Sequence, residues 1–245
     1  MIDIHCHLIP CIDDGSQSIE ETIQMVQKAD KIGYEGIFAT PHYIESAHET
    51  QSDDIQEKVK QLNALLESKG INCKIYVGNE VYFTSEILEL LQTSKVCTLG
   101  GSKYVLVEFP LNGTALNMES VITNICQVGY VPVIAHPERY EFVHKDIKKL
   151  LPLIEEGALL QINVGSISGY YGNITRKTVI KLLKKNMVHL IGTDSHNSSS
   201  IYDIWEDSIK KIEKIVKKDR LQQMLIENSK SILKDEVIDV WSPKK

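Results

Sequence analysis

The feature that most constrains this chain is a regular alternation of short apolar runs with amphipathic segments. Each run is rich in strand-forming residues, and apolar residues at helical spacing follow it. The expected strands are 2–5, 36–40, 72–78, 104–108, 131–135, 159–163 and 188–193, and the expected helices include 19–32, 54–68, 85–91, 118–128, 146–155 and 175–185. Units of about 30 residues predict βα repeats and a parallel sheet.

Side chains that bind metals stand just after most of these expected strands. They are His5 and His7, His42 after Thr40-Pro41, Glu80 after Gly78-Asn79, Glu108, His136 before Pro137-Glu138-Arg139, and Asp194 with His196. The strands of a parallel barrel all end at one mouth, so these groups converge there. The sequence therefore predicts an α/β fold, a distorted (β/α)7 barrel of the TIM type, with a polynuclear metal site at the C-terminal mouth.

The spacing within two of these motifs supports this interpretation. His5 and His7 are two residues apart on a strand, so both rings point to the same face, and Cys6 between them points away. Asp194 and His196 repeat that spacing at the far end of the barrel. Burying such groups without partners is costly, so a merely structural role is the weaker interpretation. For Glu108 a salt bridge across the barrel remains an alternative.

Other polar residues are less clearly ligands. In Asp13-Asp14-Gly15 one aspartate could bind a metal ion and the other could form the turn. His48 and His144 are expected in solvated loops or helices, and His189 on the strand face opposite Asp194. We interpret these three histidines as structural.

The donor set indicates which ions would fit. Nitrogen and oxygen ligands without thiolates suit manganese, iron or zinc, with the choice set partly by availability. Five imidazoles and four carboxylates are too many for one ion, so two or three divalent ions are expected. Three dications would outweigh four carboxylates, which favours an anion such as phosphate. Arg139 could fork onto phosphate oxygens, unless it pairs instead with Glu138 or Glu141.

The bulk properties exclude several classes of protein. The chain has 245 residues and a net charge of −6, which argues against non-specific binding to nucleic acid. It has no signal-peptide pattern and no apolar run of about 18 residues, so we expect no stable membrane insertion and a cytoplasmic location. Five scattered cysteines fit reduced thiols. We expect one domain, 1–245, ending in a polar tail from about 236 to 245.

Taken together, His5-x-His7, Thr40-Pro41-His42, Gly78-Asn79-Glu80, 135–139 and 192–196 resemble the PHP (polymerase and histidinol phosphatase) superfamily. Within it, Asp13-Asp14-Gly15, Glu108-Phe109-Pro110 and 134–139 are similar to the manganese-dependent protein-tyrosine phosphatases of bacterial capsule and exopolysaccharide biosynthesis. The resemblance covers residues 1 to about 235. It implies a PHP domain whose metal ligands are His5, His7, Asp14, His42, Glu80, Glu108, His136, Asp194 and His196, with Arg139 orienting the phosphate.

The resemblance also implies a reaction and a partner. The enzyme would be a phosphoric monoester hydrolase in which a metal-bound water attacks phosphorus. Its substrate would be a phosphotyrosine protein, a bacterial tyrosine kinase that regulates capsule synthesis. One departure stands out: members of this branch often carry a second arginine shortly after the last motif, whereas here Asn197 is followed by no arginine before Arg220.

Three alternatives remain open: a small-molecule phosphatase of the histidinol-phosphatase type, a nuclease or proofreading domain, and a regulatory binding module with a vestigial site. Cysteine-phosphatase chemistry is excluded, because no cysteine has an arginine six residues on. Aromatic residues near the mouth could stack on a phenyl ring; they are Tyr43, Tyr82, Phe83, Tyr140, Tyr170 and Tyr171. The basic run Lys210, Lys211, Lys214, Lys217, Lys218 and Arg220 is expected to be a solvated helical face.

Overall fold

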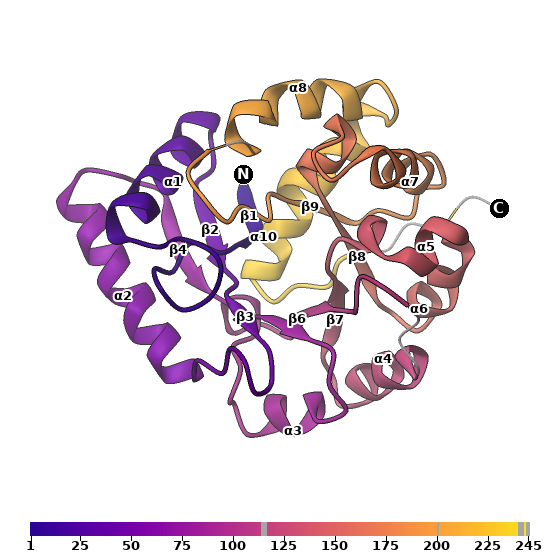
Figure 1. Ribbon diagram of the computed structural model, residues 1–245, viewed down its shortest axis with the longest axis horizontal. Helices are drawn as coiled ribbons and strands as arrows, with labels where there is room; N and C mark the ends of the chain where they lie inside the picture. The colour runs from indigo at the N-terminus through magenta and orange to yellow at the C-terminus, as the bar shows by residue number, and fades with distance from the viewer. Residues whose placement is uncertain (114–116, 200, 240–242, 244–245) are drawn as a thin grey trace.

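The computed structural model describes residues 1–113, 117–199, 201–239 and 243, and its strands form a parallel barrel surrounded by helices (Figure 1). The pairing order is β1-β2-β4 in one sheet and β3-β5-β6-β7-β8-β9 in another. The strands are β1 Ile2–Cys6, β2 Gly36–Ala39, β3 His42–Tyr43, β4 Lys74–Val77, β5 Glu80–Tyr82, β6 Tyr104–Glu108, β7 Val131–Ile134, β8 Leu159–Asn163 and β9 Leu190–Gly192. The predicted distorted barrel is confirmed.

Nine strand segments stand where seven strands were expected, because β2 and β4 are each followed, after a break of two residues, by a short strand that was not predicted. Thr40 and Pro41 separate β2 from β3, and Gly78 and Asn79 separate β4 from β5. Pro41 has no N–H to continue the ladder, and its carbonyl accepts hydrogen bonds from the Glu80 backbone at 3.1 Å and from the Asn79 amide at 3.0 Å. Each interruption is followed directly by a predicted metal ligand.

The barrel closes between its first and last strands. The backbone N–H of Asp194 donates to the His5 carbonyl at 2.8 Å, and that of His7 donates to the Ser195 carbonyl at 2.9 Å. The buried Asp3 carboxylate accepts from the Thr193 hydroxyl at 2.6 Å and from the Thr193 N–H at 3.0 Å. This closure brings the two histidines of β1 beside the ligands that follow β9.

Most of the helices lie around the outside of the strands, and the last one lies behind the centre of the barrel (Figure 1). They are α1 Ile19–Ile32, α2 Ser52–Ser68, α3 Ile87–Gln92, α4 Met118–Gln127, α5 Glu141–Lys145, α6 Leu151–Glu155, α7 Asn173–Lys184, α8 Ile201–Glu213, α9 Lys218–Gln222 and α10 Asn228–Leu233. The expected helix 146–155 is wrong in detail, because a 3-10 turn (η3, Ile147–Leu150) precedes α6. The short helix α5 was not predicted.

The start of α1 has one half of a capping box, the motif in which an N-cap serine and a glutamate three residues later each bond the backbone N–H of the other. The Ser18 side chain caps the helix by accepting from the Glu21 N–H at 3.1 Å, and Gly33 ends it with φ 101°. However, the Glu21 carboxylate accepts from the N–H of Gln17 and not from that of Ser18. Ile19, the first residue of α1, is 47% exposed.

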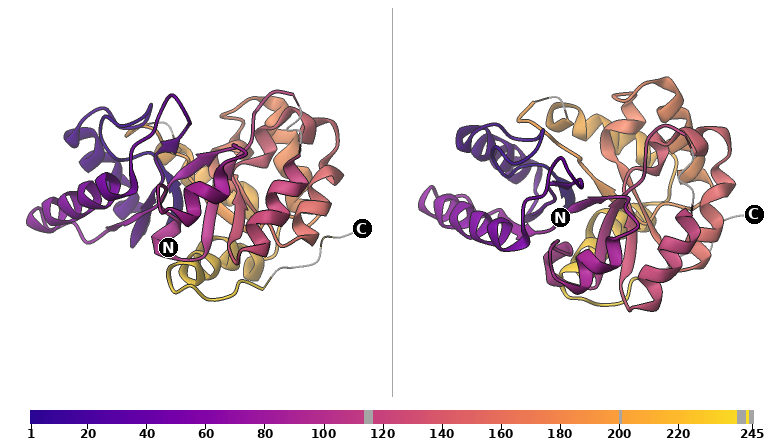
Figure 2. Two further views of the ribbon diagram at one scale, coloured as in Figure 1. Left: turned by 90° about the horizontal axis from the view of Figure 1, so that it is seen from below. Right: turned by 60° about the horizontal axis from the view of Figure 1, so that its bottom comes forward.

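The C-terminal helices cover the amino-terminal end of the barrel, opposite the predicted site (Figure 2). The Arg220 guanidinium donates to the Val188 carbonyl, and the Asn228 amide donates to the His189 carbonyl at 2.7 Å. Arg220 is buried, so its assignment to a solvated basic face is wrong. Of the expected tail, Ile238 is also buried, while 240–242 and 244–245 lie outside the described residues.

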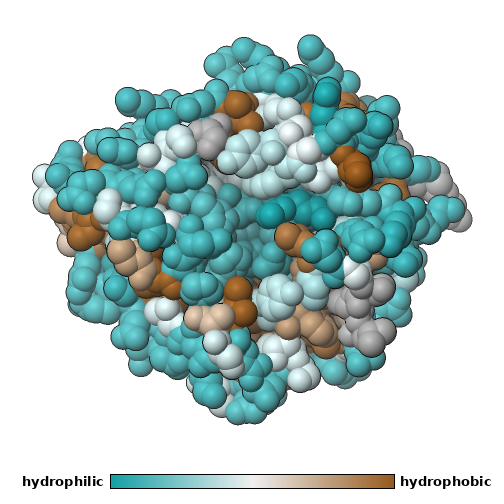
Figure 3. Space-filling model, in the orientation of Figure 1, coloured by the Kyte–Doolittle hydropathy of each residue, from teal (hydrophilic) through white to brown (hydrophobic). Residues whose placement is uncertain are grey.

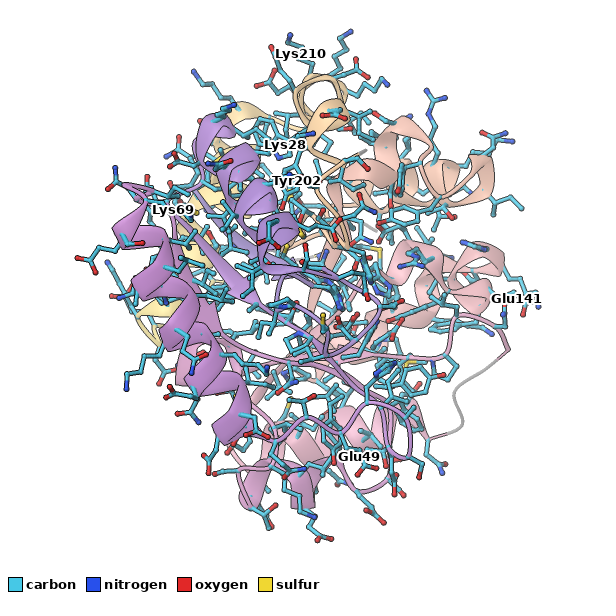
Figure 4. All side chains as sticks on the ribbon, turned by 60° about the vertical axis from the view of Figure 1, so that its left-hand side comes forward. Lys28, Glu49, Lys69, Glu141, Tyr202 and Lys210 are labelled. Atoms are coloured by element: carbon cyan, nitrogen blue, oxygen red, sulfur yellow. The ribbon has the colours of Figure 1, made fainter. Side chains whose placement is uncertain are left out.

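The rest of the basic run behaves as expected where α8 carries it. Lys210 points away from the barrel (Figure 4) and pairs with Glu206 at 2.6 Å, while Ile209 and Ile212 are buried beneath it. On the face opposite the C-terminal helices the centre is hydrophilic, and apolar residues form small separate patches (Figure 3). Among the described helices, none combines the length and apolar character that a membrane span requires.

His189 makes the stability of this end of the barrel depend on pH. Its Nδ1 accepts from the Leu160 N–H at 2.9 Å, and burial lowers the pKa of the imidazole to about 3, with repulsion from Arg220 adding to the effect. The unfolded chain binds a proton there below about pH 6.5, whereas the folded chain does not until about pH 3. Stability is therefore lost as pH falls between these values, by about 1.4 kcal/mol per pH unit.

We predict that His189→Asn, which keeps an acceptor for Leu160 but cannot be protonated, flattens this dependence. Urea unfolding of the metal-free protein at pH 7 and at about pH 5 would measure it. The free energy of unfolding should fall less with acidification in the variant than in the wild type. Equal losses in both proteins would show that His189 is not the titrating group.

Candidate metal centre

A fully buried carboxylate, that of Glu80, lies at the centre of the site. Glu80 is the first residue of β5, and four imidazoles surround it. Its Oε2 is 3.2 Å from His5 Nε2, 3.2 Å from His7 Nε2 and 3.1 Å from His42 Nδ1. Its Oε1 is 3.0 Å from His136 Nε2. One carboxylate thus reaches imidazoles from three separate parts of the barrel.

Asp194 is a second point of convergence, directly after β9. Its Oδ1 lies 3.4 Å from His5 Nε2 and 3.5 Å from both His7 Nε2 and His196 Nδ1. The backbone is left-handed at Asp194, with φ 51°, and at His136, with φ 31°. Such conformations cost about 1–2 kcal/mol in non-glycine residues, so their presence at two predicted ligands is typical of a functional site.

The remaining predicted ligands form the outer part of the site. Asp14 Oδ1 is 3.5 Å from Nε2 of both His42 and His196. Glu108, the last residue of β6, is 3.6 Å from His136 and 3.9 Å from His42. Glu108 faces the mouth, which argues against the alternative of a salt bridge at the barrel floor.

These residues form four overlapping groups, in each of which the potential ligand atoms lie within 4.8 Å of one another. The groups are His7, Asp14, His42 and His196; His5, His7 and Glu80; His5, His136 and Asp194; and His42, Glu80 and Glu108. All nine predicted ligands are therefore brought together. Ligand atoms around one ion, at about 2.1 Å from it, are separated by about 3.0–3.4 Å, close to the separations found here.

The donor atoms and their surroundings also fit metal ions. Glu80 Oε2 and His42 Nδ1 are buried and point into the cluster, and although they lie 3.1 Å apart neither makes a hydrogen bond among the described residues. Buried polar atoms are rarely left so, and a cation would satisfy both. Cys6 is buried but its thiol faces the Ser195 carbonyl, as its place between the two histidines predicted.

The pKa values of the cluster are shifted because buried imidazoles and carboxylates lie close together. Burial lowers the pKa of His5, but attraction to Glu80 and Asp194 outweighs it and raises the pKa to about 9. Burial lowers the pKa of His42 to about 4 despite the attraction of Glu80. Burial and repulsion from Glu80 and Asp194 raise the pKa of Glu108 to about 8. Metal ions bound here would take over from protons the role of neutralising the buried carboxylates.

The two neighbouring aspartates divide the roles that the sequence left open. The Asp13 carboxylate accepts from His7 Nδ1 at 2.8 Å, from the Gly15 N–H at 2.9 Å and from the His42 N–H at 3.0 Å. It therefore leaves His7 Nε2 as the lone-pair nitrogen facing the cluster. Asp14 is the aspartate that faces His42 and His196. The turn residue and the candidate ligand are thus separate.

Arg139 lies at the edge of the cluster, and it pairs with neither Glu138 nor Glu141, the two alternative partners that the sequence offered. Its Nη1 donates to Asp194 Oδ2 at 3.0 Å, and the guanidinium carbon lies 4.6 Å from the centre of the Tyr171 ring. Glu138 is instead fully buried, where it accepts from the Asn163 N–H and the Ser166 hydroxyl. Glu141 pairs with Lys145 at 2.6 Å. The alternative ion pairs are therefore wrong.

A chain of buried amides, which sequence reasoning missed, supports the ligands from β8. Gln161 Oε1 accepts from His5 Nδ1 at 2.9 Å, and the Gln161 amide donates to Asn163 Oδ1 at 2.9 Å. The Asn163 amide then donates to Asp194 Oδ2 at 2.6 Å. The sequence did hold one indication of this chain of amides. Gln161 and Asn163 are two residues apart on a predicted strand, so their side chains lie on the same face of the strand.

A cavity of about 370 Å³ opens onto the cluster. It is lined by Asp14, His42, Ile44, Glu80, Glu108, Leu111, His136, Arg139, Tyr170, Tyr171, Asp194, Ser195, His196, Asn197 and Ile201. Of the six aromatic residues proposed for the mouth, only Tyr170 and Tyr171 are among these. Tyr43 and Tyr140 are buried in the core.

The three histidines interpreted as structural lie outside the four groups. The His48 ring is 6.5 Å from that of His42, centre to centre. His144 Nε2 bonds to the Glu138 carbonyl at 2.8 Å, and His189 lies at the opposite end of β9 from Asp194. None of them reaches the ligand atoms described above.

Comparison with known structures establishes the class of fold. A crystal structure described as YwqE from Bacillus subtilis and CpsB from Streptococcus pneumoniae, unique metal-dependent tyrosine phosphatases, superposes with a TM-score of 0.94 at 30% identity, covering 100% of this chain and 98% of the other. Histidinol phosphate phosphatase from Lactococcus lactis gives a TM-score of 0.55 at 17% identity, over 87% and 93% of the two chains, and so shares the fold. The barrel and its ligand cluster define a PHP-like fold.

Comparison of sequences identifies the family. The profile described as capsular polysaccharide synthesis, CpsB/CapC, matches residues 1–234, so the chain belongs to this family. Tyrosine-protein phosphatase YwqE of Bacillus subtilis is 31% identical over 238 residues, 97% of this chain and 93% of the relative. Tyrosine-protein phosphatase CpsB of Streptococcus agalactiae is 30% identical over 243 residues, 97% and 100% of the two chains. The predicted family is confirmed, and it is one of tyrosine-protein phosphatases.

The amide chain generates a prediction about metal affinity. Gln161→Leu removes the acceptor for His5 Nδ1 and the donor to Asn163, so two ligands lose their orienting bonds. We expect the affinity for manganese to fall about 10- to 100-fold, measured by calorimetry on the metal-stripped protein.

Asn63→Leu is the matched control, because Asn63 bonds only the backbone of Ile75 on β4, at 2.8 and 2.9 Å in the described structure. It should lower thermal stability and leave the manganese affinity unchanged. Wild-type affinity in Gln161→Leu would contradict the role given to the amide chain.

Proposed function

We propose that this chain is a metal-dependent protein-tyrosine phosphatase that acts on phosphotyrosine of a bacterial tyrosine kinase controlling capsule synthesis. The observation that carries the proposal is the convergence of nine candidate ligands with nitrogen and oxygen donors, Glu80 among them at the centre, with Arg139 beside them at the cavity. The relatives are named tyrosine-protein phosphatases, which supports phosphotyrosine as the group attacked, and the description of the family supports the link to capsule synthesis. We further propose that residues 1–245 act as one catalytic domain in the cytoplasm.

We propose that His5, His7, Asp14, His42, Glu80, Glu108, His136, Asp194 and His196 hold two or three ions, with manganese preferred over iron or zinc. Imidazole and carboxylate donors suit all three elements. When bound, these ions supply the Lewis acidity that activates an attacking water and the positive charge that neutralises phosphate oxygens. The carboxylate of Glu80 lies within reach of four imidazoles and would hold the ions at the centre of the cluster.

Arg139 supplies the chain's own contribution to phosphate binding. It lines the cavity, remains 24% exposed and is held in place by Asp194 and by the Tyr171 ring. A planar guanidinium held in this way can donate two parallel hydrogen bonds to phosphate oxygens and stabilise the charge of the transition state. A tyrosine leaving group helps, because a phenol has a pKa of about 10 and departs more readily than an alkoxide.

The first test is hydrolysis by the metal-stripped protein after manganese is restored. We expect a phosphotyrosine peptide to be hydrolysed in preference to histidinol phosphate and a phosphoserine peptide. His136→Ala should abolish turnover of all three, because it removes a ligand that contacts Glu80. Preference for histidinol phosphate would favour the small-molecule phosphatase, and no turnover of any ester with manganese demonstrably bound would favour a binding module.

A second test concerns Arg139. Arg139→Ala should lower kcat/KM for the phosphotyrosine peptide about 100-fold or more, the scale seen when a donor to transition-state charge is removed. Arg139→Lys, which keeps the charge but not the fork, should lower it by less. Arg176→Ala is the control, since Arg176 lies on α7 outside the residues that line the cavity.

Manganese affinity must be measured alongside, because Arg139 also bonds Asp194. An activity loss that disappears at saturating manganese would show that Arg139 acts only through the metal site and does not contact the phosphate.

A further inference from the structure

An exposed aromatic ring, that of Tyr170, borders the cavity that holds the candidate metal ligands. Tyr170 is 47% exposed and lines the same cavity as Arg139, Asp194 and His196. It lies between the 3-10 turn η4 (Val164–Ser168) and α7. Single exposed apolar residues are ordinary, but a large ring at the rim of a charged cavity offers a flat contact surface to whatever enters.

Contacts of the backbone and of Cβ fix the position of Tyr170 in its loop. The Tyr170 N–H donates to the Gly165 carbonyl at 3.2 Å, and a Cβ on Gly165 would lie 3.3 Å from Tyr170 Cβ. Gly169 and Gly172 flank the tyrosine pair with φ of 85° and 93°, turns that other residues rarely adopt. Tyr170 therefore rests on a glycine inside a tightly turned loop.

Tyr171 connects Tyr170 to the phosphate-binding arginine. The two tyrosine rings meet edge to face, 4.9 Å apart at 84°. The Tyr171 ring lies 4.6 Å from the Arg139 guanidinium carbon, and its hydroxyl is 3.5 Å from Asp194 Oδ2. The polarity of this wall of the cavity therefore varies along its length. The charged groups of Asp194 and Arg139 lie at the inner end, and the aromatic rings of Tyr171 and Tyr170 lie toward the rim.

This order of polarity matches that of one class of phosphate ester. In an aryl phosphate the charged group is joined to a flat apolar ring through a single oxygen. With the phosphate beside Arg139, the ring would extend toward Tyr170, and the apolar side chains of Leu111 and Ile44 also line the cavity. An alkyl ester such as phosphoserine has no ring to meet this wall.

We propose that Tyr170, supported by Tyr171, is the ring-binding wall that selects aryl over alkyl phosphate esters. The inference rests on the proposed phosphatase function and adds to it the residue that determines the substrate class. Arg139 and the metal ligands contact only the phosphate group, so selective binding of phosphotyrosine, as distinct from the faster departure of its phenol, requires a contact with the ring itself.

The test uses two non-hydrolysable ligands of the same charge, phenylphosphonate and methylphosphonate, on the full chain loaded with manganese. Tyr170→Ala should weaken binding of phenylphosphonate about three- to tenfold, the range of aromatic contact strengths, and leave methylphosphonate unchanged. Tyr170→Phe should bind both as the wild type does. With a phosphotyrosine peptide the loss in Tyr170→Ala should fall mainly on KM.

Ile174→Ala is the matched control, because Ile174, the second residue of α7, is 64% exposed and does not line the cavity. It should change neither affinity. Equal weakening of both phosphonates by Tyr170→Ala, or no change in either, would overturn the proposal. A wild type that hydrolyses no ester would instead refute the proposed function, and the two binding constants would still test the wall.

Discussion

The structure depends on the neutralisation of the Glu80 carboxylate. This group is fully buried, and burial by itself favours its protonated form, yet His5 and His42 hold its pKa well below the ordinary value. A charged carboxylate in such a place is tolerated only when cations or hydrogen-bond donors surround it. The interruptions before β3 and β5, the closure of β1 on β9 and the left-handed turn at His136 all bring such donors to it.

The support around the ligands is as specific as the ligands themselves. Asp13 fixes the His7 ring, and Gln161 fixes that of His5, so that Nε2 of each ring faces the cluster. Asn163 and Arg139 both donate to Asp194 Oδ2, which leaves Oδ1 for the cluster. Each candidate ligand in this group therefore presents one defined atom, an arrangement that suits ions with ordered coordination.

The sequence was most informative where one physical rule decides the outcome. Strand exits in a parallel barrel share one mouth, so the amino-acid sequence alone predicts that His5, Glu108 and Asp194 lie together.

The contacts that the sequence could not predict depend on distances between segments far apart in the chain. Arg139 has acidic neighbours in sequence, but its partner is Asp194, which the fold brings within 3.0 Å. Arg220 follows a lysine-rich stretch, which predicts an exposed side chain, but its guanidinium donates to the Val188 carbonyl at the amino-terminal end of the barrel. The amides of Gln161 and Asn163 support ligands without being ligands, so only their contacts to His5 and Asp194 give them a role.

The position of Arg139 has a consequence for a site without a second arginine after Asn197. The guanidinium already uses Nη1 to bond Asp194, which also faces His5, His7 and His196 through its other oxygen. A phosphate that draws on Arg139 must therefore affect a carboxylate of the ligand cluster, and the cluster must affect the arginine. Under the proposed function, phosphate binding and metal binding would be coupled through Arg139, and its stacking on Tyr171 limits how far that side chain can turn.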